Sequence, residues 1–503
     1  MTTDNQEDLM TIRGHPWPQV VRWLLALLVL YTIGSVFISN PFSLFVDRTT
    51  PIDYSRAMYF HGMAVGLAGI TSLILAEVFT LTKTCRKVIL FCTVAAVLIG
   101  VTGGAVNRSM EETKLFIWYQ IFSFFALDAI LITLTYGLLT TKDTALRGTR
   151  AWYLVLAAVI TGLIGALIGD LAGFILDFGK WPGIQVWYAN LIGYSLQDWQ
   201  DNLLRSHSDL IVVAVIGLLL SVIDWKYGRH LEGTAARVQA FGEWLAIAGL
   251  AILTVIMVVN AFGGVNCQIP HIFTEKGFYA PRGTSVAGID LGDFTIGSLF
   301  FPGGILVLGA ILFGKKAAGF SLSAASKRTL AGLFITWCSI LVTVGGMGFL
   351  EEYRADLYNS AKDVVLGNFG FAFKMLHVDV SLMMLPALML VMILSQHFLK
   401  DAVNKTVQTL LLVSVILCSI GCFVYMVVNP SLLGPGYWVI AAGFVFVIAA
   451  MVMFFKKSGA QLEESFRKES VTFLCLRRGV SGLQSTAFPL SFFSLPTQRC
   501  FRF

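Results

Sequence analysis

Three histidines lie near the starts of separate apolar runs, which is unusual for a side chain that carries charge so readily. They are His61 in Tyr-Phe-His-Gly-Met, His207 in Arg-Ser-His-Ser-Asp and His377 in Met-Leu-His-Val-Asp. A single histidine of this kind is most simply explained as a buried side chain bonded to a neighbouring helix. Imidazoles that meet at one level can instead hold one or two metal centres, because six-coordinate haem iron takes two axial nitrogens. The histidines therefore predict either ligands to haem iron or polar links between helices.

Carboxylates accompany the histidines inside the apolar runs, where each charged group costs a few kcal/mol. Asp170, Asp209 and Asp379 are expected at the level of the histidines, and Asp128 belongs to a second, deeper set with Glu77. Asp209 and Asp379 each follow a histidine by two residues, a spacing that points them toward a neighbouring helix. There they could accept protons or orient a ligand. For Asp128 and Glu77, anchoring between helices and proton transfer are equally open.

The composition excludes a soluble domain. The chain is 56% hydrophobic and 13% charged, with a mean hydropathy of +0.76, against about 25% charged residues in soluble domains. Its net charge of +6 lies mostly in short breaks between apolar runs, which indicates membrane orientation rather than nucleic-acid binding. The eight cysteines contain no Cys-x-x-Cys pair, so neither a disulfide framework nor a zinc site is indicated. The expected surroundings are a lipid bilayer.

A helix needs about 20 apolar residues to cross the hydrocarbon layer. Runs of this kind predict an all-α, polytopic protein of about twelve transmembrane helices. The runs lie at about 19–39, 57–80, 88–106, 115–139, 152–178, 207–224, 242–262, 291–314, 329–350, 368–396, 406–428 and 435–455.

The distribution of Lys and Arg predicts the orientation of these spans. Alternate loops carry nineteen basic residues on one side and ten on the other, and short cytoplasmic loops retain positive charge. Both termini are therefore expected in the cytoplasm and the three histidines in the outer half of the membrane. We expect a cytoplasmic segment at 1–18, a twelve-helix domain at 19–455 and a disordered cytoplasmic tail at 456–503. An aromatic-rich outer segment at about 179–206 is expected to lie at the membrane interface.

The positions of the histidines resemble those in subunit I of the haem-copper oxidase superfamily, which includes nitric oxide reductases. The likeness covers about residues 19 to 455. His61-Gly-Met matches the family's haem ligand near the start of span two, and His377 is similar to the haem ligand of span ten. His207-Ser-Asp209 is similar in place to the copper-binding His-Pro-Glu of span six. The resemblance implies a low-spin haem b held by His61 and His377, with His207 at a copper or other second metal.

The sequence departs from that family at the binuclear centre. The run at 242–262 has no histidine where the family has an adjacent pair. Met375 occupies the place of the family's high-spin haem ligand, unless His377 takes that role and Asp379 replaces the other ligand. The resemblance thus implies a respiratory oxidoreductase subunit, oxidase- or nitric oxide reductase-like, with an altered or lost haem-copper centre. Its partners would be other respiratory subunits and cytochrome c or quinol, in the plasma (inner) membrane. Asp209, Asp379, Asp170 and Asp128 would transfer protons or orient ligands.

Two other functions fit the same sequence. A proton-coupled secondary transporter also has about twelve spans and uses intramembrane Asp, Glu and His, although no convincing repeat relates the two halves of this chain. A non-catalytic membrane subunit that conducts electrons from quinol or docks partners would look much the same. Bound haem b distinguishes plain transport from the respiratory alternatives.

Overall fold

The computed structural model describes residues 17–38, 54–109, 114–141, 147–178, 182–193, 195–263, 268–270, 288–353, 385–399, 401–423, 436 and 438–459. The chain divides into two compact units, Met1–Lys457 and Ser458–Phe503. Of the second unit only residues 458 and 459 are described. Most of the predicted tail, most of the predicted N-terminal segment, and the predicted site residues His377 and Asp379 therefore lie outside the described residues.

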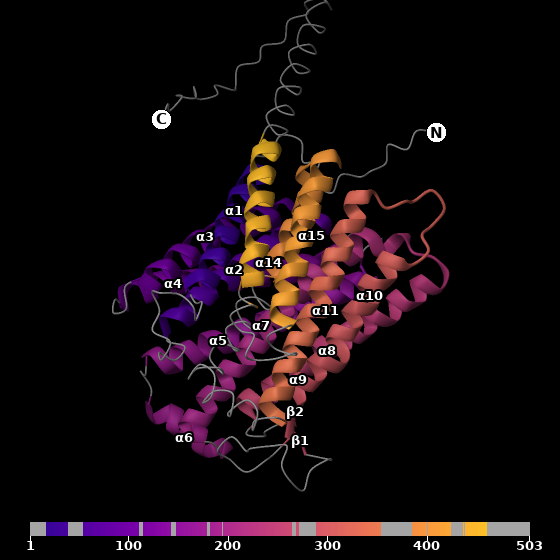
Figure 1. Cartoon of the computed structure of the whole chain (residues 1–503). Coiled ribbons are helices and arrows are strands. Elements are labelled where there is room, and N and C mark those ends of the chain that lie inside the picture. Colours follow the sequence, from indigo (N-terminus) through magenta and orange to yellow (C-terminus); the bar gives the residue numbers. More distant parts are fainter. Residues whose placement is uncertain are drawn as a thin grey trace, which may run out of the picture. The chain divides into compact units, whose positions relative to one another are not determined.

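The predicted helical class is confirmed, and Figure 1 shows the helices of the first unit. Each of the predicted apolar runs coincides, at least in part, with a described helix. Nine described helices are long and apolar enough to cross a membrane, which makes this a multi-pass membrane protein. The helices are α1 (Trp17–Ile38), α2 (Tyr54–Val78), α3 (Lys83–Ser109), α4 (Lys114–Thr140), α5 (Arg150–Phe178), α6 (Pro182–Ile192), α7 (Leu196–Tyr227), α8 (Gly233–Phe262), α9 (Leu291–Thr295), α10 (Phe301–Phe313), α11 (Ala324–Tyr353), α14 (Leu385–Phe398), α15 (Asp401–Phe423) and a last helix at Trp438–Gly459.

Several helix boundaries differ from the predicted runs. Helix α7 begins at Leu196, well before the predicted start at 207, and α3 begins at Lys83 rather than at 88. Helical hydrogen bonds do not require apolar side chains, so a helix can continue into polar sequence beyond the membrane. The run at 291–314 is divided by a π-helical segment, η2 (Ile296–Phe300), between α9 and α10. Hydropathy alone carries no signal for such a change of helix type.

The predicted interfacial segment at 179–206 contains the short helix α6 and the first turns of α7. Two of its aromatic side chains close the end of α8: Tyr188 Oη donates to the Phe262 carbonyl at 2.6 Å, and Trp199 Nε1 to that of Ala261 at 2.8 Å. These bonds satisfy carbonyls that lack helical partners, and burial raises the pKa of Tyr188. Between α8 and α9, strands β1 (Gln268–Pro270) and β2 (Gly288–Asp290) form an antiparallel pair. The sequence did not predict this pair.

Helices α8 and α10 touch through their backbones. A Cβ atom on Gly303 would lie 2.6 Å from the Ala246 nitrogen and 2.7 Å from the Gly242 carbonyl, and one on Gly249 would lie 2.8 Å from the Phe300 nitrogen. Small residues at this spacing occupy one face of α8, as is common where helices meet in lipid. Close packing therefore fixes η2 and α10 against α8.

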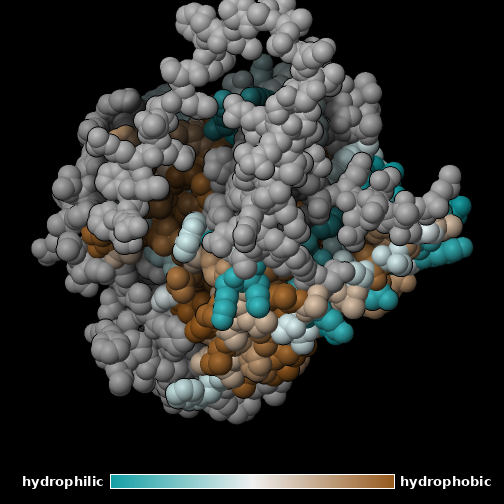
Figure 2. Space-filling model, turned by 90° about the horizontal axis from the view of Figure 1, so that it is seen from above, coloured by the Kyte–Doolittle hydropathy of each residue, from teal (hydrophilic) through white to brown (hydrophobic). Residues whose placement is uncertain are grey.

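Large hydrophobic side chains cover much of the surface that the structure describes. Phe91 and Phe313 are each 76% exposed, and Trp438 is 79% exposed. Figure 2 shows such hydrophobic residues in brown beside groups of hydrophilic residues in teal. Apolar exposure on this scale is unfavourable in water, so these surfaces fit a lipid environment.

Candidate functional site

His207 is positioned by a row of glycines on α5. Gly162, Gly165 and Gly169 recur at helical spacing, so they share one face, and α7 packs directly on that face. A Cβ on Gly165 would lie 2.8 Å from Cβ of Leu210, and one on Gly169 would lie 2.2 Å from Nδ1 of His207. The imidazole therefore lies close against the α5 backbone, where its Nδ1 is 2.8 Å from the Gly165 carbonyl.

His61 of α2 lies beside this imidazole. The ring centroids of His61 and His207 are 5.7 Å apart, with 13° between their planes. Phe124 of α4 packs on His61 at 4.9 Å between centroids. The next residue, Gly62, allows α2 to approach α3, because a Cβ there would lie 2.6 Å from the Gly100 carbonyl. The expected meeting of histidines from separate helices is thus present for His61 and His207.

Two carboxyl groups complete this group of side chains. The carboxyl groups of Asp128 of α4 and Asp170 of α5 lie within hydrogen-bonding reach of each other, and Asp170 interacts electrostatically with His61. A hydrogen bond between two carboxyl groups requires an acid proton on one of them. The expectation that Asp128 belongs to a separate, deeper set is therefore wrong. The four side chains come together because α2, α4, α5 and α7 pack on one another.

We call His61, Asp128, Asp170 and His207 the His/Asp cluster. Asp209 is partly buried on α7, and its proposed role with the cluster stays a prediction. Among the residues that the structure describes, no three His, Cys, Asp or Glu side chains are placed to hold a metal ion. The side chains of the cluster are two imidazoles and two carboxyl groups, which can bind and release protons.

Glu77, the other residue of the predicted deeper set, forms an ion pair with Arg86. The Arg86 guanidinium donates to Glu77 Oε2 at 2.8 Å, between the end of α2 and the start of α3. The carboxylate is mostly buried, whereas the arginine is about one-third exposed. Of the two roles left open for Glu77, this geometry favours the anchor between helices.

A second buried polar group was missed in the sequence. The Gln239 amide of α8 donates to Asp224 of α7 at 2.7 Å and to Glu243 of α8 at 2.9 Å, and Arg150 of α5 pairs with Glu243. We call these four residues the Arg/Glu cluster. Two carboxylates within apolar sequence, in Val-Ile-Asp-Trp and Gly-Glu-Trp-Leu, were the available signal. They were overlooked because they lie near the ends of their runs.

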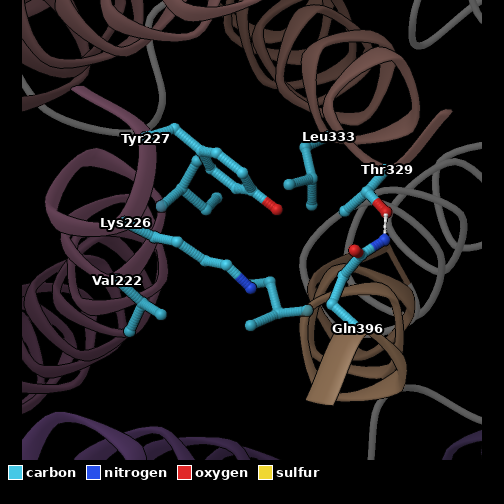
Figure 3. A pocket seen from close by; sticks show the side chains of 8 residues that line it. Val222, Lys226, Tyr227, Thr329, Leu333 and Gln396 are labelled. Carbon is cyan, nitrogen blue, oxygen red and sulfur yellow. Dashed lines mark hydrogen bonds between the residues drawn. The ribbon is translucent and has the colours of Figure 1, made fainter. Parts of the chain in front are cut away.

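A small pocket lies between α7, α11 and α14 (Figure 3). Lys226 and Tyr227 extend toward it from α7, while Thr329 and Gln396 are hydrogen-bonded to each other on the other side. About 10 Å³ is open to the centre of a water molecule, which is room for about one water. The pocket is therefore too small for an organic ligand.

Comparison with protein-family models, with curated proteins and with solved structures finds no match for this chain. The function is therefore argued from the geometry of the His/Asp cluster.

Proposed function

We propose that this protein is a proton-coupled membrane transporter whose proton-binding site is the His/Asp cluster. The observation that carries the proposal is the close approach of the Asp128 and Asp170 carboxyl groups, beside His61 and His207. Buried ionisable groups in membrane helices commonly form proton relays, and a carboxyl pair that shares one proton can release it or take up another. The adjacent imidazoles extend this pair, because histidine changes charge near physiological pH.

The arrangement on four helices supports coupling between proton binding and movement. His61, Asp128, Asp170 and His207 come from α2, α4, α5 and α7 respectively. A change in the charge of the cluster alters the attraction between these helices, so protonation and helix position are thermodynamically linked. The Gly165 carbonyl holds Nδ1 of His207, which leaves Nε2 as the nitrogen for proton exchange.

The membrane orientation belongs to the same proposal. We propose twelve spans in the plasma membrane, with both termini in the cytoplasm and the His/Asp cluster in the outer half. The excess of Lys and Arg in alternate loops supports this orientation. Single cysteines placed at Gly148 and Gly183, in a chain whose native cysteines are replaced, test it. Only the cysteine at position 183 should react with an impermeant thiol reagent added outside.

Reconstituted protein with a pH-sensitive dye inside the liposomes tests the proton-binding site. Asp128→Asn and Asp170→Asn each remove an acidic proton at nearly constant shape, so each should reduce proton movement at least tenfold. Glu77→Gln is the matched control, since Glu77 is paired with Arg86 away from the cluster. Proton movement that stays unchanged in the Asp128→Asn/Asp170→Asn double variant would overturn the proposal.

A second candidate is the haem-binding respiratory subunit that the family resemblance implies. One observation favours it: two of the three histidines expected at one level do come together, His61 and His207. In this candidate His61 and His377 hold haem b, which would supply electron transfer. The copper site is not supported, because the described residues offer no group of three metal ligands. We derive no step through copper.

Purified protein decides between the two candidates. A reduced-minus-oxidised haem b spectrum that is lost in His61→Ala and in His377→Ala would establish the respiratory candidate. His230→Ala is the control, because His230 stacks on Phe320 at the other end of α7. Protein without haem, or haem that persists in both variants, would exclude the clamp formed by His61 and His377.

A further inference from the structure

The Arg/Glu cluster shares helices α5 and α7 with the His/Asp cluster, where it lies toward the opposite ends, and its other two residues belong to α8. Asp224 follows His207 along α7, and Arg150 precedes Asp170 along α5. At 1.5 Å per residue, Asp224 and His207 are separated by about 25 Å along the helix axis. The two clusters are thus distinct sites.

Both carboxyl groups of the Arg/Glu cluster are buried. Asp224 and Glu243 are each 2% exposed, and the Gln239 side chain that joins them is 5% exposed. The charged groups that act on Asp224 are Glu243 and Arg150. With both acids ionised, these three residues would carry one uncompensated negative charge, and an unpaired buried charge is strongly unfavourable.

The hydrogen bonds of the Arg/Glu cluster leave one carboxyl oxygen without a donor. The Gln239 amide donates to one oxygen of each carboxyl group, and Arg150 pairs with the other oxygen of Glu243. Oδ2 of Asp224 is buried, and no donor among the described residues reaches it. The same carboxyl group nevertheless lies beside that of Glu243, because one Gln239 nitrogen donates to both acids, and the two acids interact. A proton between the two acids would satisfy both the charge and the geometry.

We infer that Asp224 and Glu243 form a second proton-binding site, which holds one proton that both carboxyl groups share. Arg150 balances the remaining negative charge, and its 44% exposed side chain reaches from the pair toward solvent. Proton exchange at this site takes place by dissociation of the shared acid proton, without any other bond change. Its role as the cytoplasmic end of a proton path rests on the proposed function. The binding of the proton does not.

Gly228 has a part in this arrangement. A Cβ atom at Gly228 would lie 2.0 Å from Nε2 of Gln239 and 2.7 Å from Oδ1 of Asp224. The absence of a side chain at position 228 thus leaves the space in which the amide reaches both acids. Gly228→Ala should displace Gln239 and alter the environment of the shared proton without removing any charge.

Infrared difference spectroscopy of the full-length protein in liposomes tests the site, because a protonated carboxyl group has its own C=O stretching band. One band should disappear in Asp224→Asn and also in Glu243→Gln, since the remaining acid is then balanced by Arg150. Gly228→Ala should shift that band. A spectrum in which neither Asp224→Asn nor Glu243→Gln loses a band would overturn the inference.

Two further variants keep the result decisive. Arg150→Gln changes a half-exposed side chain and should add one protonated carboxyl group, because no cation then balances the second acid; an unchanged spectrum would contradict the shared-proton site. Asp128→Asn should remove a band of the His/Asp cluster and leave the Asp224 band in place. If the His/Asp cluster holds no proton, Asp128→Asn removes no band, while Asp224→Asn still removes its own. The failure of the proposed function and the failure of this inference are therefore distinguishable.

Discussion

The imidazole rings of His61 and His207 lie nearly parallel, with 13° between their planes and 5.7 Å between their centroids. They belong to helices α2 and α7, which are far apart in the sequence. Two cationic imidazoles at this distance would repel each other in a medium of low dielectric constant. The pair is therefore most stable with at most one ring charged, and the acids beside it determine which ring that is.

Gly169 allows His207 to lie against α5. Because a Cβ at position 169 would fall 2.2 Å from Nδ1 of the imidazole, Gly169→Ala should displace the ring and break its bond to the Gly165 carbonyl. We expect a loss of about 1–3 kcal/mol in the free energy of unfolding, measured by thermal unfolding in detergent. Gly297→Ala, where a Cβ would meet nothing within 4 Å, should have no such effect. Equal stability of both variants would contradict the close packing of His207.

At Gly303 the backbones of α8 and α10 are so close that no side chain fits between them. Gly303→Ala would place its Cβ 2.6 Å from the Ala246 nitrogen, and backbone atoms cannot move aside as a flexible side chain can. We expect a destabilisation of about 2 kcal/mol or more, as is typical of overpacked interiors. Gly309→Ala on the same helix is the matched control, because its Cβ would make only an ordinary contact of 3.5 Å with Phe334. The fraction of each variant that stays folded in detergent as the temperature rises measures the difference in stability between Gly303→Ala and Gly309→Ala.

The aromatic cap of α8 should contribute to stability. Tyr188→Phe removes the hydrogen bond to the Phe262 carbonyl, and Trp199→Phe removes that to Ala261. Each change should cost about 1 kcal/mol and raise hydrogen exchange in the last turn of α8. Trp187→Phe, at a side chain that is 61% exposed, should leave exchange unchanged. Protection that persists in both capping variants would show that other groups satisfy these carbonyls.

Asp128 and Asp170 should differ in their response to isosteric and to truncating changes. Asp128→Asn keeps a hydrogen-bonding group beside Asp170, so its free energy of unfolding should change by less than about 1 kcal/mol. Asp128→Ala leaves Asp170 without this partner and should cost about 1–3 kcal/mol. Thermal unfolding of both variants at one pH gives the comparison. A destabilisation of the same size in both would indicate that the acid proton itself holds the helices together.

The helices of this protein could be predicted from sequence because apolar runs of membrane length have few alternatives. The runs at 152–178 and 242–262, for example, agree closely with α5 and with the latter part of α8. Helix ends, the π-helical segment η2 and the strand pair β1–β2 carried no signal in hydropathy. They depend on backbone contacts between neighbours, such as the approach of Gly249 to Phe300.

The candidate site was predictable only in part. Positions along the spans predicted that histidines would meet, as His61 and His207 do, but the choice of neighbours required the packing of α2, α4, α5 and α7. The glycines at 162, 165 and 169 are the signal in the sequence for the close approach of α7. His377 and Asp379 lie outside the described residues, so their roles stay predictions. Asp224 and Glu243 were missed because each acid is unremarkable until Gln239 brings them together.

The glycine contact between α8 and α10 limits how this protein can move. Helices whose main chains touch have no intervening side chains that could slide or change rotamer, so α8 and α10 must shift as one solid piece. In the proposed transporter, the opening and closing of a path would therefore take place at helix contacts that are lined by side chains. The contact between α4 and α5, where Asp128 and Asp170 face each other, is such a place, and under the proposed function one proton there would control whether the two helices stay together.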